Sequence, residues 1–197
     1  MVRWCQYTGH HRCLYSGFVT STQYNELDAE LVRSFANTVD AEDGTDRLAS
    51  IDEFRNWLRE HDLDDAHQPI GSDDVALARD LRRALRAEMA SHHDDVPDPV
   101  ARATLDRLAA ELPVHIVPST GALEPVGGGP RGALTRVLAS THSLVNAGVW
   151  NRLKICPNDD CAWAFYDESR NRSRRWCSMN VCGNRHKVRA YRDRLAE

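Results

Sequence analysis

Apolar residues recur at helical spacing over most of the first 150 positions of the chain. From Glu26 onward they lie on one face of a helix with 3.6 residues per turn; the positions are Leu27, Leu31, Val32, Phe35, Ala36 and Val39. The tetrapeptide SIDE at 50–53 is a capping box, in which the Ser50 hydroxyl accepts a hydrogen bond from the Glu53 amide. The pattern therefore predicts one helix that ends before residue 40 and a second helix that begins after Ser50.

Three more amphipathic helices and one β-hairpin are predicted after these two. Ser72 is expected to cap the first of the three helices, and Asp98, followed by a proline, is expected to cap the second. The turn residues PSTG separate two short apolar stretches, a pattern typical of a hairpin. In order, the predicted elements are a helix over 72–92, a helix over 98–112, strands over 114–117 and 122–126, and a helix over 131–150.

These elements predict an α+β protein that is mainly α, with a helical N-terminal domain that contains the small β-hairpin, and a small C-terminal unit. The helical domain is expected over 26–149 and the C-terminal unit over 150–197. Residues 1–25 are polar and irregular, and they are left as an unassigned N-terminal arm. Two cysteines and a histidine in this arm offer metal-binding groups, although a loose arm fits the pattern better.

The composition is that of a soluble globular protein, with 42% hydrophobic and 27% charged residues. The net charge of −4 conceals a division, because residues 150–197 carry 11 Lys/Arg against 6 Asp/Glu and the remainder is strongly acidic. No apolar run approaches the ~20 residues of a membrane helix, and the chain does not start with a secretory signal. We therefore expect no membrane association and a cytoplasmic location.

Four cysteines near the C-terminus form two pairs with equal internal spacing, C-x4-C-x15-C-x4-C. In a reducing compartment this pattern predicts one Zn²⁺ ion bound by four thiolates, a closed site that is structural and not catalytic. Free structural cysteines, disulfides and an iron–sulfur cluster are the alternatives, which the pattern favours less. The predicted ligands are Cys156, Cys161, Cys177 and Cys182.

The C-terminal unit is too small to bury much apolar surface, so zinc binding, about 10–16 kcal/mol, is expected to supply most of its folding free energy. The sequence predicts a strand over 151–155, a cysteine knuckle, a β-hairpin over 162–176 that turns at 167–172, a second knuckle and a helix. This order of elements is treble-clef-like. The residues expected on the inner face of the last helix are Val188, Tyr191 and Leu195.

The segment WCSMNVCGNR followed by HKVRAYRDR, with SRNRSRRW before it, resembles the CGNR zinc-finger family of bacteria. The family is named after its last cysteine and the three residues that follow, here Cys182, Gly183, Asn184 and Arg185. Upstream, LVRSFANTVD followed by DEFRNWL is similar to the start of the ABATE domain found in the same family. The resemblance covers about residues 26–197 and implies a stress-induced or other transcriptional regulator, with a DNA-binding finger and a sensing N-terminal domain.

Residues 169–195 contain nine Lys or Arg and one acidic residue, so the expected partner of this segment is a polyanion. Arginine suits phosphate because its planar group donates two parallel hydrogen bonds and keeps its charge. Gly183, Asn184 and Arg185 are also expected to cap the last helix and brace the second knuckle. The candidate DNA contacts are Arg170, Arg172, Arg174, Arg175, Arg185, Lys187, Arg189 and Arg192.

Two non-enzymatic alternatives to DNA binding stay open at this point. In the first, the zinc-stapled unit is a protein-interaction module whose basic residues pair with an acidic partner or with the acidic body of this chain. In the second it binds RNA, and Trp163, Phe165 and Tyr166 stack on bases. A homodimer is expected if the DNA site has dyad symmetry.

Asn37 and Thr38 interrupt an apolar helical face, and buried polar side chains need partners. Backbone groups or water would satisfy them, as would an unidentified small-molecule effector in a ligand pocket. Catalysis is not expected, because neither the stretch His92–Asp95 nor the pair His142–Ser143 places its polar groups on one helical face.

Overall fold

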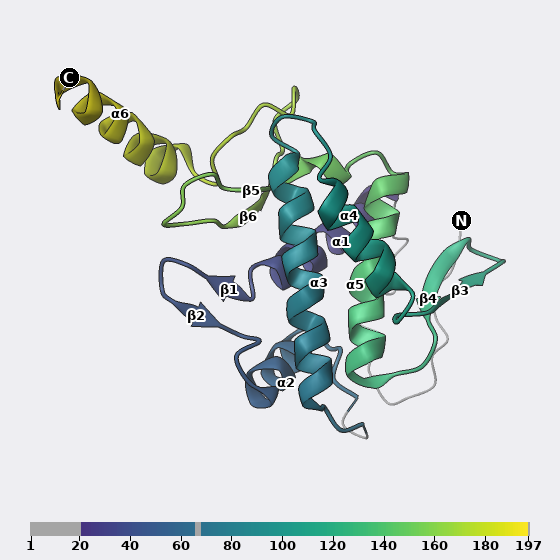
Figure 1. Cartoon of the computed structure of the whole chain (residues 1–197). Coiled ribbons are helices and arrows are strands. Elements are labelled where there is room, and N and C mark those ends of the chain that lie inside the picture. The colour runs from purple at the N-terminus through teal and green to yellow at the C-terminus, as the bar shows by residue number, and fades with distance from the viewer. Residues whose placement is uncertain (1–20, 66–67, 197) are drawn as a thin grey trace.

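The computed structural model describes residues 21–65 and 68–196 and is mainly helical (Figure 1). Cys5, His10 and Cys13, the candidate metal-binding groups of the N-terminal arm, lie outside these residues. The elements of the N-terminal domain are α1 (Ser21–Ala36), β1 (Val39–Asp40), β2 (Thr45–Asp46), α2 (Ile51–Glu60), α3 (Ser72–Ser91), α4 (Pro99–Ala109), β3 (Val114–Val117), β4 (Ala122–Pro125) and α5 (Gly129–Asn146).

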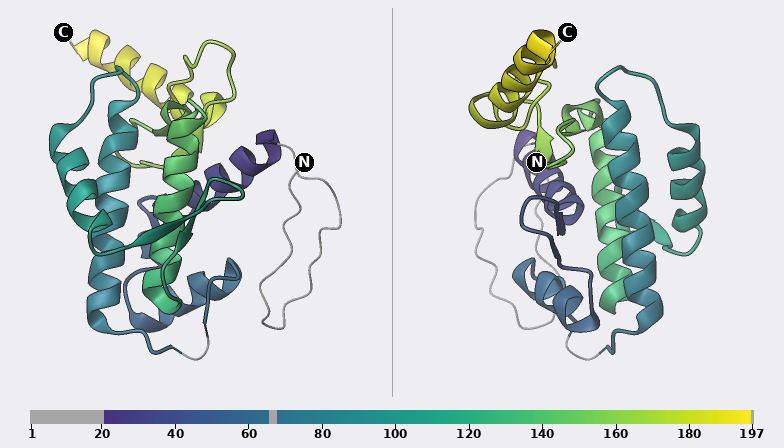
Figure 2. Two further views of the ribbon diagram at one scale, coloured as in Figure 1. Left: turned by 90° about the vertical axis from the view of Figure 1, so that its right-hand side faces the viewer. Right: turned by 60° about the vertical axis from the view of Figure 1, so that its left-hand side comes forward.

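The core of the N-terminal domain lies where α1, α3 and α5 pack against one another, as the views in Figures 1 and 2 show. Most of the apolar positions that recur at helical spacing in the sequence are buried, among them Phe35 of α1, Leu85 of α3 and Leu134 of α5. Two positions predicted for the first helical face differ, because Leu27 is 65% exposed and Val39 lies in β1, beyond the end of α1. α2 adds Phe54 and Trp57 to the same cluster, and α4 covers the outer side of α3. The helical domain predicted from the periodicity is thus confirmed.

The N-termini of three helices show how the local sequence determines where a helix begins. The Glu53 amide donates to the Ser50 hydroxyl at the start of α2, and Asp98 accepts from the two amides at the start of α4, as predicted. The cap of α3 was wrongly assigned to Ser72. Ser72 is instead the first residue of the helix and Gly71 is the cap, with its amide donating to the Asp74 carboxylate.

Two small antiparallel hairpins project from the helices. β3 and β4 pair as the sequence predicts, with Ile116 opposite Leu123. β1 and β2 form a second hairpin that the sequence did not predict, in which the Asp40 carboxylate accepts from two amides of its own turn and Gly44 adopts a positive φ. The last helix of the domain ends at Asn146, earlier than predicted, because Gly148 turns the chain at φ 66°.

The C-terminal unit begins with a 3₁₀ turn and ends in a helix that projects away from the rest of the protein (Figures 1 and 2). Leu153 and Ala164 of this unit are fully buried and belong to the same apolar cluster as the helical domain. The unit is therefore packed onto the domain and is not a loosely tethered tail. Its elements are a 3₁₀ turn (Trp150–Arg152), β5 (Leu153–Ile155), β6 (Ala164–Tyr166), a π-helical turn (Met179–Gly183) and α6 (Asn184–Ala196).

Two sequence-based expectations for this unit are wrong. β6 pairs with β5 across the first cysteine knuckle, so the hairpin carries that knuckle at its tip and does not lie between the two knuckles. Residues 167–175 form an irregular loop, because a buried Asp167 binds the amides that a second strand would have used. The inner face predicted for α6 is exposed, since Val188, Tyr191 and Leu195 are 48%, 58% and 70% accessible on a helix that projects from the domain.

In the part of the chain that the structure describes, helices long and apolar enough to cross a lipid bilayer are absent.

Candidate metal centre

Two knuckles bring the four cysteines together. Their sulfur atoms all lie within 4.8 Å of one another, and the Sγ···Sγ distances from Cys177 to Cys161 and to Cys182 are both 3.6 Å. Four sulfurs about 2.3 Å from a tetrahedral Zn²⁺ stand about 3.8 Å apart, whereas a disulfide needs about 2.05 Å. The cluster therefore fits one zinc ion held by Cys156, Cys161, Cys177 and Cys182, all of which are free thiols in the structure.

The first knuckle is the tip of the β5–β6 hairpin. The Cys161 and Ala162 amides both donate to the Asn158 carbonyl, and Ala162 takes a positive φ of 46° to close the turn. The Asn158 side chain is 7% exposed, and its amide points at the Cys182 sulfur, 3.7 Å away. Asn158 was not among the residues predicted to support the zinc site. A polar residue between two knuckle cysteines is, however, well placed to donate a hydrogen bond to a ligand sulfur.

The second knuckle is built into the start of the C-terminal helix. The chain from Met179 to Gly183 forms a π turn, and the Gly183 amide donates to the Ser178 carbonyl. A Cβ atom on Gly183 would lie 2.5 Å from the Met179 sulfur and 3.3 Å from the Trp176 ring. A larger residue at position 183 would therefore require the Met179 side chain to move.

The electrostatics of the thiols make the site sensitive to protons. Burial raises the pKa of the Cys161 thiol to about 11, and burial also raises the pKa of the Cys177 thiol. For Cys182 burial acts in the same direction, but hydrogen bonds, the Asn158 amide first among them, lower its pKa overall. Zinc binding must therefore displace protons from at least two of the sulfurs, so the affinity of the site falls as pH falls.

A second organising centre lies beside the cysteines, in the loop that leads to the second knuckle. The Asp167 carboxylate is fully buried and forms an ion pair of 2.9 Å with Lys154, whose side chain is also buried. Asp167 accepts further bonds from Ser169 and from the Arg174 amide, while the Lys154 ammonium donates to the Arg172 and Arg174 carbonyls. The Lys154–Asp167 pair therefore sets the conformation of the arginine-rich loop. Nothing in the sequence around Asp167 indicated that its carboxylate would be buried.

The candidate DNA contacts divide into three groups. Arg172 bonds to Asn151 and to the Gly148 carbonyl, and Arg174 bonds to the Trp176 and Cys177 carbonyls while lying over the Phe165 ring. Both side chains therefore have a bracing role inside the protein. Arg170, Arg175, Lys187 and Arg192 are exposed and have no hydrogen bond or ion pair with any described residue.

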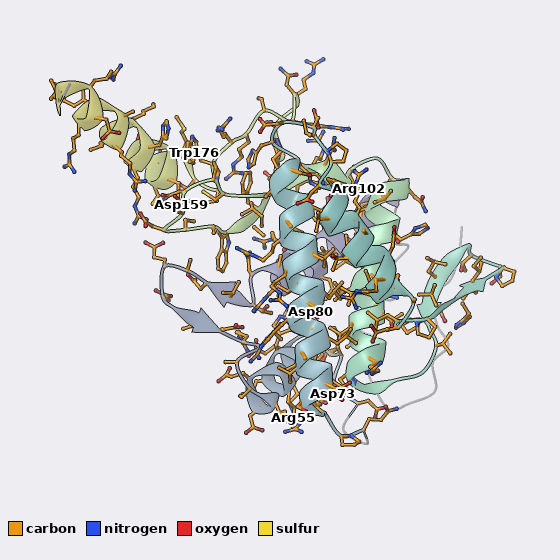
Figure 3. All side chains as sticks on the ribbon, viewed as in Figure 1. Arg55, Asp73, Asp80, Arg102, Asp159 and Trp176 are labelled. Carbon is orange, nitrogen blue, oxygen red and sulfur yellow. The ribbon has the colours of Figure 1, made fainter. Side chains whose placement is uncertain are left out.

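The two remaining basic candidates on α6 pair with acidic groups. Arg185 lies 2.8 Å from Glu42 on the β1–β2 hairpin, and Arg189 lies 3.2 Å from Asp160 in the first knuckle. The Asn184 side chain donates to the Asn180 carbonyl of the π turn, which fits the cap expected of it. In Figure 3 the side chains of α6 extend into open space around the helix, and the labelled Trp176 lies near its base.

The helical domain holds the unit through side chains that bind finger backbone. Asn37, His92 and His93 all contact finger backbone, and Asn37 and Thr38, the two residues expected at a ligand pocket, also line a cavity next to the finger. Asn37 both donates to and accepts from the backbone of Ala164. The remaining contacts run from Arg86 to the Ala162 carbonyl (2.7 Å), from His92 to the Leu153 carbonyl (2.6 Å) and from His93 to the Ile155 carbonyl (2.6 Å).

Thr38 is buried, donates to the Phe35 carbonyl and accepts from Arg82, so protein groups satisfy its hydroxyl. His142 bonds to Asn146 on its own helix and brings no serine into reach. Phe165 is 4% exposed and packs beside the cysteines, while Trp163 and Tyr166 are half-buried. Of the three aromatic residues suggested for RNA, Phe165 is therefore in the interior of the finger, whereas Trp163 and Tyr166 keep part of their surface accessible.

The geometry defines a helical domain joined to a treble-clef-like finger whose four cysteines can hold a single zinc ion. The helical domain and the finger each match the sequence model of a known family. The sequence model for ABATE, described as "Putative stress-induced transcription regulator", matches residues 29–148, and the model for the CGNR zinc finger matches residues 152–195. The chain belongs to this ABATE family and carries a CGNR zinc finger at its C-terminal end. A comparison with curated proteins gave no match.

Proposed function

We propose that the protein is a transcriptional regulator that binds DNA through the loop and helix supported by its zinc site. The observation that carries the proposal is the projection of α6 and the neighbouring loop from the domain, with unpartnered basic side chains on both. A family description as a transcription regulator supports the same role. The helical domain would serve as the part that senses a signal.

The physical basis is phosphate contact on a rigid support. Zinc and the Lys154–Asp167 pair would hold the loop in place, and α6 begins directly at the second knuckle. The basic side chains of the loop and of α6 would then contact a duplex without a large loss of backbone conformational entropy. Such contacts release counterions, and affinity then falls steeply with salt, with a slope of about −0.9 per phosphate contacted. α6 would add base contacts if it entered the major groove.

Fluorescence anisotropy with a random duplex at several salt concentrations tests the proposal. The variant Arg170→Gln/Arg175→Gln should reduce the salt slope by about 2 if both residues contact phosphate. Arg55→Gln/Arg83→Gln makes the same charge change on exposed helices of the domain and should leave the slope unchanged. Failure of the zinc-loaded protein to bind duplex at low ionic strength, or a salt slope near zero, would refute DNA binding.

A protein-interaction role is the second candidate, and the exposed apolar stripe of α6 favours it. Val188, Tyr191 and Leu195 follow one another at helical spacing among the arginines, and they have no partner in the described residues. A second copy of this chain would cover such a stripe in a homodimer. Sedimentation equilibrium of the wild type and of Tyr191→Ser/Leu195→Ser decides this, because a dimer should dissociate in the variant while a monomer stays unchanged.

A further inference from the structure

A cavity of about 300 Å³ lies between the helical domain and the finger, outside the zinc site. Its walls come from α1, the β1–β2 hairpin and α2, and the finger contributes Trp163. The volume is at the lower end of the range for sites that hold small molecules. The side chains in its wall include Arg33, Ser34, Asn37, Arg47, Trp57 and Trp163.

Part of this wall is fixed in advance by hydrogen bonds. The Ser34 hydroxyl lies 2.5 Å from His61 Nε2, and the Trp57 indole N–H donates to the same hydroxyl at 3.3 Å. His61 Nδ1 lies 2.9 Å from the Trp57 carbonyl, which acts as acceptor and places the ring proton on Nδ1. Ser34 therefore gives its one proton to His61, and toward a ligand it presents only a lone pair.

Two arginines supply the hydrogen-bond donors that remain. Arg33 and Arg47 pair with Glu30 and Glu60, but the arginines are 36% and 35% exposed whereas the glutamates are 59% and 54% exposed. The arginine side chains are thus less exposed than the glutamates with which they pair. Arg47 Nε is buried and lacks an acceptor among the described residues, so the donors available to a ligand are the terminal Nη groups of the two arginines.

Three carboxylates, those of Glu30, Asp40 and Glu60, share the cavity wall with the two arginines, so an incoming anion must replace a glutamate in its ion pair. The Asp40 side chain is turned toward amides of its own loop through Oδ1. The Glu30 and Glu60 pairs are exposed, and exposed pairs contribute little free energy, so a ligand carboxylate displaces them at small cost. The cavity walls then offer guanidinium groups for an anion and the half-buried Trp163 indole for a flat apolar body, whereas Trp57 is 2% exposed and its ring stacks on His61.

We propose that this cavity binds a small aromatic carboxylate, with the carboxylate on Arg47 and Arg33 and the ring against Trp163. Binding is coupled to the finger because the cavity contains the residue that follows the first knuckle. The Trp163 carbonyl accepts from the Cys156 amide at 2.8 Å, and Asn37, also in the wall, holds Ala164. The effect on DNA rests on the proposed function, but binding and its coupling to zinc do not.

The test uses full-length zinc-loaded protein and calorimetric titration with benzoate and 4-hydroxybenzoate, and benzamide and benzylamine serve as neutral and cationic controls. We expect the carboxylates to bind saturably and benzamide to bind about tenfold more weakly, because the loss of one charge-assisted hydrogen bond lowers affinity by about that factor. Arg47→Gln should weaken binding about tenfold or more for the same reason. Arg55→Gln, on α2 but not in the cavity wall, is the matched control and should bind as the wild type does.

A second readout tests the coupling. By thermodynamic reciprocity, a ligand that binds more tightly to the zinc-loaded protein must raise the affinity for zinc by the same factor, as measured in equilibrium competition with a chelator, and Arg47→Gln must abolish this increase. The site proposal is overturned if neither carboxylate binds, if the amide or the amine binds as well as the acid, or if Arg47→Gln leaves the affinity unchanged. Carboxylate binding in a protein that fails to bind duplex would refute the proposed function and leave this site standing.

Discussion

Replacing Asp167 by Asn should destabilise the finger without touching a zinc ligand. The Asp167 carboxylate is fully buried and accepts bonds from the Lys154 ammonium, from Ser169 and from the Arg174 amide. Asparagine keeps the shape of the side chain but removes its charge. The Lys154 ammonium, itself 3% exposed, is then left in the interior without a counter-ion.

The structure sets the size of the effect. Burial raises the pKa of Asp167, but hydrogen bonds from Ser169 and Lys154 outweigh it and lower the pKa from 3.8 to about 2. The shift means that the fold prefers the ionised form by about 2.5 kcal/mol. Breaking a buried ion pair by removing one partner costs about 3–5 kcal/mol, because the remaining charge is uncompensated. We therefore expect Asp167→Asn to lower the free energy of unfolding of the finger by about 3 kcal/mol or more.

Guanidinium titration near neutral pH, followed by tryptophan fluorescence and by zinc release to a chromophoric chelator, measures this loss. Glu168→Gln makes the same change of charge one position later on an exposed side chain, and should stay within about 0.5 kcal/mol of the wild type. The double variant Lys154→Gln/Asp167→Asn removes both charges and should be more stable than Asp167→Asn alone. The reasoning is wrong if Asp167→Asn and Glu168→Gln unfold and release zinc alike.

Three further predictions concern the zinc site and its docking. Chelation should unfold the knuckles and α6 while β5, β6 and the helical domain stay protected from hydrogen exchange, because Leu153 and Ala164 share the core of the domain. Burial lowers the pKa of His92 from 6.5, so docking is most stable above about pH 6.5 and weakens as pH falls further; His92→Gln should flatten this dependence in a thermal-melting series. Asn37→Ala removes both bonds to Ala164 and should speed hydrogen exchange in β6 by about tenfold, equivalent to 1.4 kcal/mol.

The features that sequence reasoning predicted correctly are those set by local chemistry. Helical periodicity in α1, α3 and α5 reflects burial of one face, and a cap such as Ser50 or Asp98 depends on residues only three positions away. The four cysteines were found because a tetrahedral metal site requires a fixed number of soft ligands at knuckle spacing. None of these inferences needs knowledge of residues that are distant in sequence.

The features that were missed depend on long-range contacts. The pairing of β5 with β6 excludes the predicted second hairpin, since Asp167 takes the amides of the following loop. The docking contacts of Asn37 and His92 join residues 127 and 61 positions apart, and no periodicity reveals such a contact. The β1–β2 hairpin carried a signal, the turn sequence at Asp40–Gly44, but its strands are too short for an alternating pattern.

The number of basic residues in the finger does not by itself predict how strongly it binds DNA, because some of their side chains already bind groups within the protein. Nine basic residues between 169 and 195 suggest contacts with many phosphates. Arg172 and Arg174, however, donate their hydrogen bonds to Asn151 and to backbone carbonyls of the protein itself. An arginine committed to backbone carbonyls gains little from phosphate, because binding would break bonds that hold the finger. The salt slope for DNA should therefore reflect the exposed, unpartnered set and fall well short of the nine charges that composition alone suggests.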